Sequence, residues 1–491
     1  MDEAEADEES SPLDQARVVR TRERLAPAAL IATATGLGVA LGFTTQLPPA
    51  VHVLLVLSAC GAYVAMNAAQ RRWGGLSIRL VAWTVVSYCA VAVLVPPRET
   101  GDAMWYAIYG RIVAVHHASP YTHVPAVFPH DPLLRATGFG WAHVPSVYGP
   151  LFTGISAVVS PLLGAAVLPT RLFYQLLATG ALLAACAFVW RSTRSAAAVA
   201  FLGLNPVVAV YLVNGGRNDV LVGLAMLAAV IVASRGHDTA AGVVGGLGAL
   251  VKLTGLVGVV ALVASTAVLR GRRPASRMAG AALGVVTVGY LFAGSAALFT
   301  PLKTAGARFS SASLWRVVTK FGIAAPDTHL VLVLLAVLCV LVILAYSRSR
   351  GASVTAGLTT LTLGAAYMLP GYIGWAMPTA ALDHTSRVSR IAAAEGVFLV
   401  AVYEIFRHPI GGPFGHALED VARFATPFVT LALLVVLLVD AARTARRTAA
   451  TRASPVAVGA GGMDLVPRPA VSASGPVQRW FSIGRPRLNV Q

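Results

Sequence analysis

Charged residues are scarce in this chain of 491 residues, where Asp, Glu, Lys and Arg make up 12%, about half the share usual in soluble proteins. Seven of the 21 acids lie within the first 14 residues, and there are only three lysines, Lys252, Lys303 and Lys320. Hydrophobic residues make up 56%, and apolar runs of about 17–22 residues recur from residue 27 to residue 440. These runs exclude a soluble enzyme and predict a polytopic membrane protein.

Cysteine is also rare, and all four residues fall inside apolar runs: Cys60, Cys89, Cys186 and Cys339. We therefore expect small buried apolar side chains rather than disulfides or a metal site. No cluster of histidines, cysteines or paired acids stands out along the sequence. We expect no cofactor, because the chemistry proposed below requires no metal, although metal use stays open.

The net charge of +17 is compatible with a nucleic-acid-binding protein, but its distribution argues against that class. Most basic residues form short clusters at the ends of apolar runs, as the positive-inside rule describes for cytoplasmic loops. The chain should therefore bind membrane lipid and no nucleic acid.

The same charge pattern predicts a membrane domain between two tails. Residues 1–26 and 442–491 are expected to be disordered cytoplasmic tails, the first acidic and the second rich in Arg, Pro, Gly and Ser. Residues 27–441 should form an all-α domain of about 12–14 spans in the plasma membrane, with large outer loops at 98–147 and 299–327.

Three predicted segments are irregular. Residues 148–165 are short and interrupted by prolines, and they are expected to lie at the outer interface, because a crossing there would put Arg191 and Arg194 outside. Residues 239–269 begin and end on the cytoplasmic side, which requires two short helices broken near Lys252. Spans are also expected at 195–213, 219–234 and 372–383.

Two acids lie at the outer ends of predicted spans, Asp102 and Asp219. A carboxylate so close to hydrocarbon is costly unless it has a function. Trp105, Tyr106 and Tyr109 follow Asp102 on one helical face, and aromatic faces stack on sugar rings. A solvated loop acid, a helix cap and an interfacial aromatic belt are the alternatives.

The basic residues at the outer face are the second unusual feature. The loop at 300–322 contains Lys303, Arg308, Arg316 and Lys320 and no acid, and Lys252 is predicted to face the same side. Such a cluster suits an anionic lipid head group, because arginine clamps phosphate oxygens and lysine supplies a point charge. A loop with solvated charges is the alternative.

The stretch "LNPVVAVYLVNGGRND", residues 204–219, combines a proline kink with a Gly-Gly turn. A capped turn between two spans explains the glycines and Asp219. It does not explain Arg217 and Asn218.

Several short motifs, taken in order, resemble one known family. Asp102 is followed by "YAIYGRI", "PSVYGPLF", "NGGRND", "GLGALVKLTG", "SLWRVV" and "MLPGYIGWAMP". Over residues 75–385 this order resembles the GT-C membrane glycosyltransferases, in particular the actinobacterial polyprenyl-phosphomannose-dependent α-(1→6)-mannosyltransferases that build lipomannan and related lipoglycans. The resemblance implies a GT-C fold with interfacial helices in the first outer loop.

The resemblance also implies roles for residues. The acid that opens the loop is the presumed catalytic base, which is Asp102 here. In the family a histidine usually precedes Asn218, and a tryptophan usually precedes Tyr372. Here Arg217 and Gly371 stand in those places, which puts the sugar and the acceptor in question. The residues expected to bind substrate are Tyr106, Tyr109, Arg111, Tyr148, Arg217, Asn218, Asp219, Lys252, Arg308, Trp315, Arg316, Tyr372 and Trp375.

The sequence thus predicts an inverting glycosyltransferase with its active site outside and both termini cytoplasmic. It would move a sugar, expected to be mannose, from a polyprenyl monophosphate donor to a lipid-linked glycan. An arabinosyl- or other pentosyltransferase of the same architecture is one alternative. A transporter or flippase for lipid-linked sugars is the other, although such proteins often contain an internal repeat and none is evident.

Overall fold

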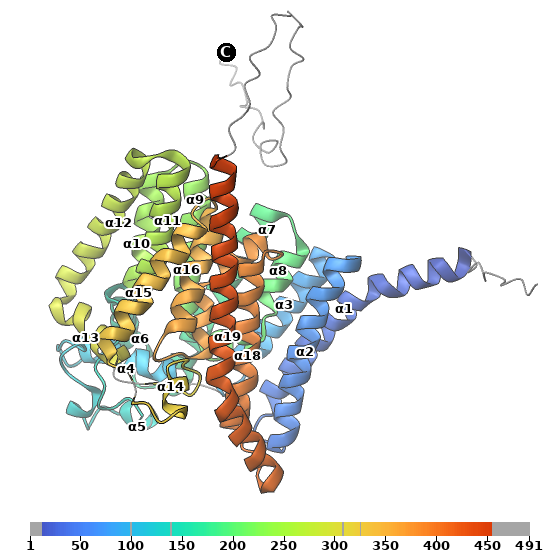
Figure 1. Cartoon of the computed structure of the whole chain (residues 1–491). Helices are drawn as coiled ribbons and strands as arrows, with labels where there is room; N and C mark the ends of the chain where they lie inside the picture. The colour runs from blue at the N-terminus through green and yellow to red at the C-terminus, as the bar shows by residue number, and fades with distance from the viewer. Residues whose placement is uncertain (1–11, 99–100, 138–139, 307–308, 325, 454–491) are drawn as a thin grey trace, which may run out of the picture. The chain divides into compact units, whose positions relative to one another are not determined.

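The structure is a computed structural model that describes residues 12–98, 101–137, 140–306, 309–324 and 326–453. The chain divides into two units, Met1–Arg447 and Thr448–Gln491, and the features below belong to the first. Within the described ranges every regular element is helical, which confirms the predicted all-α membrane fold (Figure 1). The tail expectations for 1–11 and 454–491 lie outside the described residues.

Five helices in the described part are long and apolar enough to cross a membrane: α1 (Pro12–Phe43), α2 (Pro49–Trp73), α7 (Val167–Thr193), α12 (Arg272–Ala293) and α19 (Gly412–Ala453). The first and last of them correct the predicted tails. Residues 12–26 and 442–453 are helical rather than disordered, since α1 and α19 continue through arginine-rich sequence that favours helix.

Other apolar helices are shorter: α3 (Ile78–Leu94), α6 (Pro150–Leu163), α9 (Asp219–Ser234), α10 (Asp238–Val251), α11 (Gly255–Arg270) and α15 (Thr328–Ala345). The predicted break in 239–269 is confirmed, because α10 ends and α11 begins on either side of Lys252. The span expected at 195–213 is a bent pair, α8 (Ala196–Gly203) and the π-helix η2 (Val208–Asn214), which meet at 66°.

The span expected at 372–383 is wrong. That segment consists of the short helices η3 (Pro370–Trp375), α17 (Met377–Ala380) and η4 (Ala381–Asp383). Pro370 and Pro378 remove backbone donors and interrupt a longer helix. The remaining elements are α4 (Asp102–Ala114), η1 (Pro125–Val127), α5 (Leu134–Thr137), α13 (Ser295–Gly306), α14 (Arg316–Lys320), α16 (Arg350–Gly364) and α18 (Arg387–Arg407).

The two predicted outer loops lie at the same end of the bundle, where α4, α5, α13 and α14 gather (Figure 1). A hydrogen bond joins them, since the Thr300 hydroxyl donates to the Tyr121 carbonyl oxygen at 3.2 Å. Helix α4 is buried along residues 103–112. It packs so closely on α6 that a Cβ on Gly110 would come 2.4 Å from the Ser156 carbonyl oxygen. The loop end is thus built around a buried α4.

Candidate active site

Four charged side chains form an alternating row at the loop end of the bundle, which we call the charged row: Asp102, Arg217, Asp219 and Lys252. Arg217 Nη2 lies 2.8 Å from Asp102 Oδ2, and Arg217 Nη1 lies 3.9 Å from Asp219 Oδ2. Lys252 Nζ lies 2.8 Å from Asp219 Oδ1. Two acids and two bases balance, as buried charges require.

The local sequence determines where these four side chains lie. Asp102 and Asp219 are the first residues of α4 and α9, where the helix dipole favours a negative charge. Arg217 follows a turn at Gly216, whose φ of +62° suits glycine. Lys252 sits in the break between α10 and α11, which leaves its backbone extended. Helix ends and a tight turn thus bring the four charges together.

The turn that carries Arg217 is tied to the end of α3. Asn214 Nδ2 donates to the Ala92 carbonyl oxygen at 2.9 Å, and Gln175 Nε2 donates to the Asn214 carbonyl oxygen at 2.8 Å. The turn follows directly from η2, and π-helical segments are frequent at functional sites. These amides fix the position of the turn, and therefore of Arg217.

Two aromatic rings lie beside the charged row. Trp375 Nε1 donates to Asp219 Oδ1 at 2.7 Å, and Tyr372 stacks on Trp375 with centroids 4.6 Å apart. Lys252 Nζ lies 4.4 Å from the centre of the Tyr372 ring and 5.1 Å from that of Trp375. These are cation–π distances, so the stacked pair helps to hold the ammonium group in place.

The opposite side of Arg217 meets α4. The Asn218 backbone N–H donates to the Tyr106 hydroxyl at 3.3 Å, and Tyr148 packs edge-on against Tyr106 at 4.7 Å. Asn218 is buried, and its side-chain Nδ2 has no hydrogen-bond partner in the structure. A buried amide without an acceptor, next to a charged row, is a ready donor for a bound hydroxyl or phosphate oxygen.

Gly371 makes room for Arg217. A Cβ at this position would lie 2.6 Å from Arg217 Nη1 and 2.7 Å from its Cδ. The guanidinium therefore occupies the space beside residue 371. The sequence analysis noted Gly371 as a departure from the family pattern but did not connect it with Arg217, because sequence alone does not show which side chain fills the space.

Two residues predicted to bind substrate, Tyr109 and Arg111, make contacts within the outer loop. The Tyr109 hydroxyl donates to the Val144 carbonyl oxygen at 2.7 Å. Arg111 Nε donates to both carboxylate oxygens of Asp131 at 3.0 and 2.9 Å, and His116 Nε2 lies 2.8 Å from the same acid. Burial raises the pKa of Asp131, but hydrogen bonds from His116, the Leu133 N–H and Arg111 lower it below its ordinary value overall. This cluster anchors the outer loop.

Trp315 and Arg316, two residues predicted to bind substrate, donate hydrogen bonds to backbone carbonyl oxygens. Trp315 Nε1 donates to the Gly364 carbonyl oxygen at 2.8 Å. Arg316 folds back on its own loop and donates to the carbonyl oxygens of Ser310 and Phe309, each at 2.8 Å. Arg308 lies outside the described residues. Of the basic residues predicted to bind a lipid phosphate, Lys252 belongs to the charged row.

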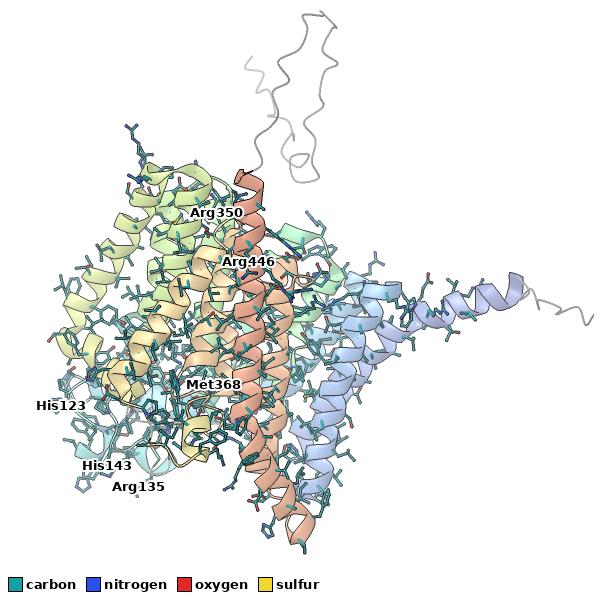
Figure 2. The ribbon with its side chains drawn as sticks, viewed as in Figure 1. His123, Arg135, His143, Arg350, Met368 and Arg446 are labelled. Carbon is teal, nitrogen blue, oxygen red and sulfur yellow. The ribbon has the colours of Figure 1, made fainter. Side chains whose placement is uncertain are left out.

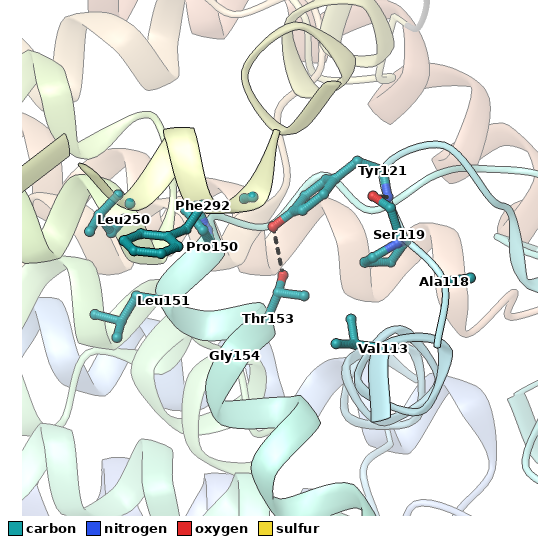
Figure 3. A pocket seen from close by; sticks show the side chains of 13 residues that line it. Val113, Ala118, Ser119, Tyr121, Pro150, Leu151, Thr153, Gly154, Leu250 and Phe292 are labelled. Carbon is teal, nitrogen blue, oxygen red and sulfur yellow. Dashed lines mark hydrogen bonds between the residues drawn. The ribbon is translucent and has the colours of Figure 1, made fainter. Parts of the chain in front are cut away.

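An apolar cavity of about 450 Å³ opens beside this site, between α4, α6, α10 and α12 (Figure 3). Leu151, Leu250 and Phe292 line it, and at its edge the Tyr121 hydroxyl donates to Thr153 Oγ1 at 3.0 Å. Burial raises the pKa of Tyr121 to about 12, so this hydroxyl keeps its proton.

The cavity is linked to the charged row along the chain, since none of the four charged residues lines it but Leu250 does. Leu250 lines the cavity and stands two residues before Lys252. The Gly149 N–H donates to the Val251 carbonyl oxygen at 2.9 Å, and a Cβ on Gly149 would come 2.2 Å from the Leu250 carbonyl oxygen. Tyr148, which packs against Tyr106, directly precedes this contact. The cavity and the charged row are therefore neighbours.

One group of three possible metal ligands is present among the described residues, His52, Glu404 and His408. The sequence analysis missed it, because the residues are far apart along the chain and no spacing motif links them. It is separate from the charged row.

The chain was compared with known proteins. Residues 25–268 match a family described as alpha-(1->6)-mannopyranosyltransferase, N-terminal domain. No curated protein and no solved structure matches. The matched segment includes all four residues of the charged row, as well as Tyr106 and Tyr148.

Proposed function

We propose that this membrane protein is a glycosyltransferase of the α-(1→6)-mannopyranosyltransferase family, whose N-terminal domain its residues 25–268 match, and that it transfers mannose from a polyprenyl monophosphate to a lipid-linked glycan. The reaction would take place on the outer face of the plasma membrane, in lipomannan or lipoglycan synthesis. The observation that carries the proposal is the charged row itself. Four buried or half-buried charges next to stacked aromatic rings are costly in a membrane protein unless they serve a reaction.

Asp102 is the proposed general base. Its side chain is 19% exposed, whereas that of Asp219 is 2% exposed, so of the two acids Asp102 is the one an acceptor can reach. In the reaction the acceptor hydroxyl oxygen attacks the anomeric carbon. Its proton passes to Asp102, while the bond from the anomeric carbon to the phosphate oxygen breaks with its electron pair on the phosphate. A β-linked donor then gives an α-linked product.

Arg217 orients the base. Its Nη2 holds Oδ2 of Asp102 at 2.8 Å, so the carboxylate keeps one direction relative to α4. Arg217 is 3% exposed and is held between two acids, which restricts its own movement. Asp219 would serve mainly to position Arg217, Lys252 and Trp375, because all three contact its two carboxylate oxygens.

Lys252 is the proposed phosphate ligand. An ammonium group has three donor hydrogens, and Lys252 Nζ donates to Asp219 Oδ1 at 2.8 Å. The Lys252 side chain is 12% exposed, and it stands two residues after Leu250, which lines the apolar cavity. Negative charge grows on the phosphate as the sugar leaves, so a fixed cation at this place would stabilise the transition state.

The cavity supports a lipid donor. Its lining is largely apolar, and it begins two residues from Lys252. An isoprenoid chain could lie there while its phosphate meets the lysine, because apolar surface favours the chain and the cation favours the phosphate.

The charge distribution supports an outward-facing site. Figure 2 shows Arg350 and Arg446 at the end of the bundle opposite His123, Arg135 and His143. Arginine clusters mark cytoplasmic ends by the positive-inside rule. The loop end, with the charged row, would then face outside.

The test uses the purified full-length protein in detergent with radiolabelled polyprenyl-phosphomannose and a mannose-bearing lipid acceptor. Asp102→Asn keeps a hydrogen-bond acceptor for Arg217 but removes the base, so kcat should fall by about 10²–10⁴-fold. The matched control is Asp440→Asn, an acid at the far end of the chain that pairs with Tyr346 and Arg387.

Three outcomes would count against the proposal. Near wild-type turnover by Asp102→Asn would remove Asp102 as the base. In detergent there is no closed membrane, so transport gives no signal and only transfer is measured. A wild-type protein that does not lengthen the glycan acceptor under these conditions would favour a transporter. Transfer from a polyprenyl-phosphopentose alone would replace mannose with a pentose.

A further inference from the structure

A second polar cluster lies away from the charged row, where α2 begins and α18 ends. His52 stands in the first turn of α2, Glu404 in the last turn of α18, and His408 directly after α18. The α1–α2 and α18–α19 turns are at the same end of the bundle as α4 and α14 (Figure 1). The cluster therefore shares the proposed outer side.

The three side chains converge on one point. His52 Nε2 lies 3.0 Å from Glu404 Oε2, and His408 Nε2 lies 3.5 Å from the same oxygen. The three ligand atoms all lie within 4.8 Å of one another. Ligands at about 2.0–2.2 Å from a tetrahedral zinc ion are about 3.3–3.6 Å apart, so these separations need only small side-chain rotations to surround an ion.

We propose that His52, Glu404 and His408 bind one divalent transition-metal ion, and that Zn²⁺ is the natural occupant. Two imidazoles and one carboxylate are a donor set for zinc, whereas Mg²⁺ and Ca²⁺ prefer oxygen ligands. Two neutral imidazoles and one carboxylate carry a single negative charge, which a divalent ion would more than neutralise. The fourth position would be open to water or another ligand.

The surroundings of Glu404 match those of a metal-binding carboxylate. The Tyr211 hydroxyl donates to Glu404 Oε1 at 3.0 Å, on the oxygen that does not face the histidines. Metal ligands are commonly held by such an outer hydrogen bond. The two carboxylate oxygens thus divide their roles, Oε1 toward Tyr211 and Oε2 toward the proposed ion.

The three ligand side chains differ in solvent exposure, which leaves an ion a route to the site. The side chains of Glu404 and His52 are 0% and 3% exposed, whereas that of His408 is 18% exposed. An ion would therefore enter past His408 and be shielded from solvent by the other two ligands. The two imidazole rings have centroids 4.0 Å apart and are tilted by 42° to each other.

The proposed ion would link three parts of the fold. It would join α2 to the end of α18, and through Tyr211 it would hold η2. Tyr211 lies six residues before Arg217 along the chain. The ion would act as a structural brace behind the turn that carries Arg217, not as a reactant.

The experiment measures metal directly and does not depend on activity. Full-length protein is purified without a polyhistidine tag, stripped with chelator, and dialysed against Zn²⁺ or Co²⁺ alone. Wild-type protein should retain about one ion per chain, and bound Co²⁺ should give the intense visible absorption of a four-coordinate site. Zn²⁺ should also raise the midpoint of thermal unfolding, because the ion binds the folded chain.

Variants assign the ion to the cluster. His52→Gln and His408→Gln should each lose the ion, and Tyr211→Phe should weaken it by about 10–100-fold, the usual effect of losing an outer hydrogen bond. The matched control is His416→Gln, which removes an exposed histidine on α19 and should bind as wild type.

Two results would overturn the proposal. The first is wild-type protein that binds neither Zn²⁺ nor Co²⁺ above the level of His52→Gln, which would leave a hydrogen-bonded triad without an ion. The second is a bound ion that survives in both His52→Gln and His408→Gln, which would put it elsewhere on the chain.

Discussion

Gly371 offers the sharpest test of how the charged row is held. In Gly371→Ala the new Cβ would lie 2.6 Å from Arg217 Nη1 and 2.7 Å from its Cδ. Carbon and nitrogen atoms in contact normally stay about 3.5 Å apart, so the guanidinium must move by about 1 Å. Arg217 is 3% exposed and packed between two acids, so it cannot move away without weakening its 2.8 Å contact with Asp102.

The size of the effect follows from that contact. A hydrogen bond between charged groups contributes about 1.5–3 kcal/mol, which corresponds to about 10- to 150-fold. Gly371→Ala should therefore lower kcat/KM for mannose transfer within that range, while the protein stays folded and inserted. The assay is the transfer of radiolabelled mannose by purified protein, with donor and acceptor varied separately.

Two comparisons make the test specific. Gly374→Ala changes the same segment, but its Cβ would come closest to the end of the Leu212 side chain, at 2.9 and 3.0 Å, and would make an ordinary contact with the Asp219 backbone carbon at 3.4 Å. In an Arg217→His background the shorter side chain vacates the space, so adding Gly371→Ala should change the remaining rate by less than about 3-fold. If Gly371→Ala keeps wild-type kcat/KM, or costs the same factor in both backgrounds, the proposed link between residues 371 and 217 is wrong.

Three further predictions concern the rest of the site. In steady-state kinetics with each substrate varied, Lys252→Ala should lower kcat/KM for the donor by about 10- to 150-fold and kcat/KM for the acceptor by less. An equal loss of kcat/KM for donor and acceptor would contradict a role in phosphate binding. Cysteines placed at Ser119 and Ser311 should react with an impermeant thiol reagent in intact spheroplasts. The four native cysteines are buried, so they should contribute little labelling. Labelling only after permeabilisation would mean that the orientation is reversed. The pKa of Asp131 in the folded protein lies below its ordinary value of 3.8. Its stabilisation of the outer loop should therefore be complete above pH 3.8 and be lost as the pH falls through the lower folded pKa. The measurement is amide hydrogen exchange in this loop, and exchange that rises already at about pH 5 would contradict the prediction.

Much of the fold could be predicted because it depends on local sequence. The helix expected at 219–234 is α9, with the same bounds, and the break near Lys252 lies where charge and span length required it. Helix α6 has 14 residues, whereas a helix needs about 20 to cross a membrane. Its length agrees with the predicted interfacial placement of residues 148–165. The error at 372–383 came from treating an apolar composition as a span despite Pro378 within it and Pro370 just before it.

The contacts within the site could be predicted only in part. Asp102, Asp219 and Lys252 attract attention individually, because each is a charge near an apolar run. Their pairing depends on tertiary structure: Trp375 meets Asp219 across 156 positions, and His52 meets Glu404 across 352. The grouping of Lys252 with Arg316 stays a prediction, and the structure adds that Arg316 donates to carbonyl oxygens in its own loop.

The two departures from the family pattern, Arg217 in place of a histidine and Gly371 in place of a tryptophan, are in contact in the structure. Considered separately, they suggested that two side chains of the family pattern are lost, with consequences for the sugar and the acceptor. The distance from the Gly371 Cβ position to Arg217 Nη1, 2.6 Å, indicates a single exchange in which one large side chain replaces another in the same space. The exchange has an electrostatic consequence. A histidine between Asp102 and Asp219 would gain and lose its charge near its ordinary pKa of about 6.5, whereas an arginine stays charged at every physiological pH. In this chain the proposed base is therefore held by a cation that does not titrate, and the alternating charges of the row persist whether or not the donor phosphate is bound.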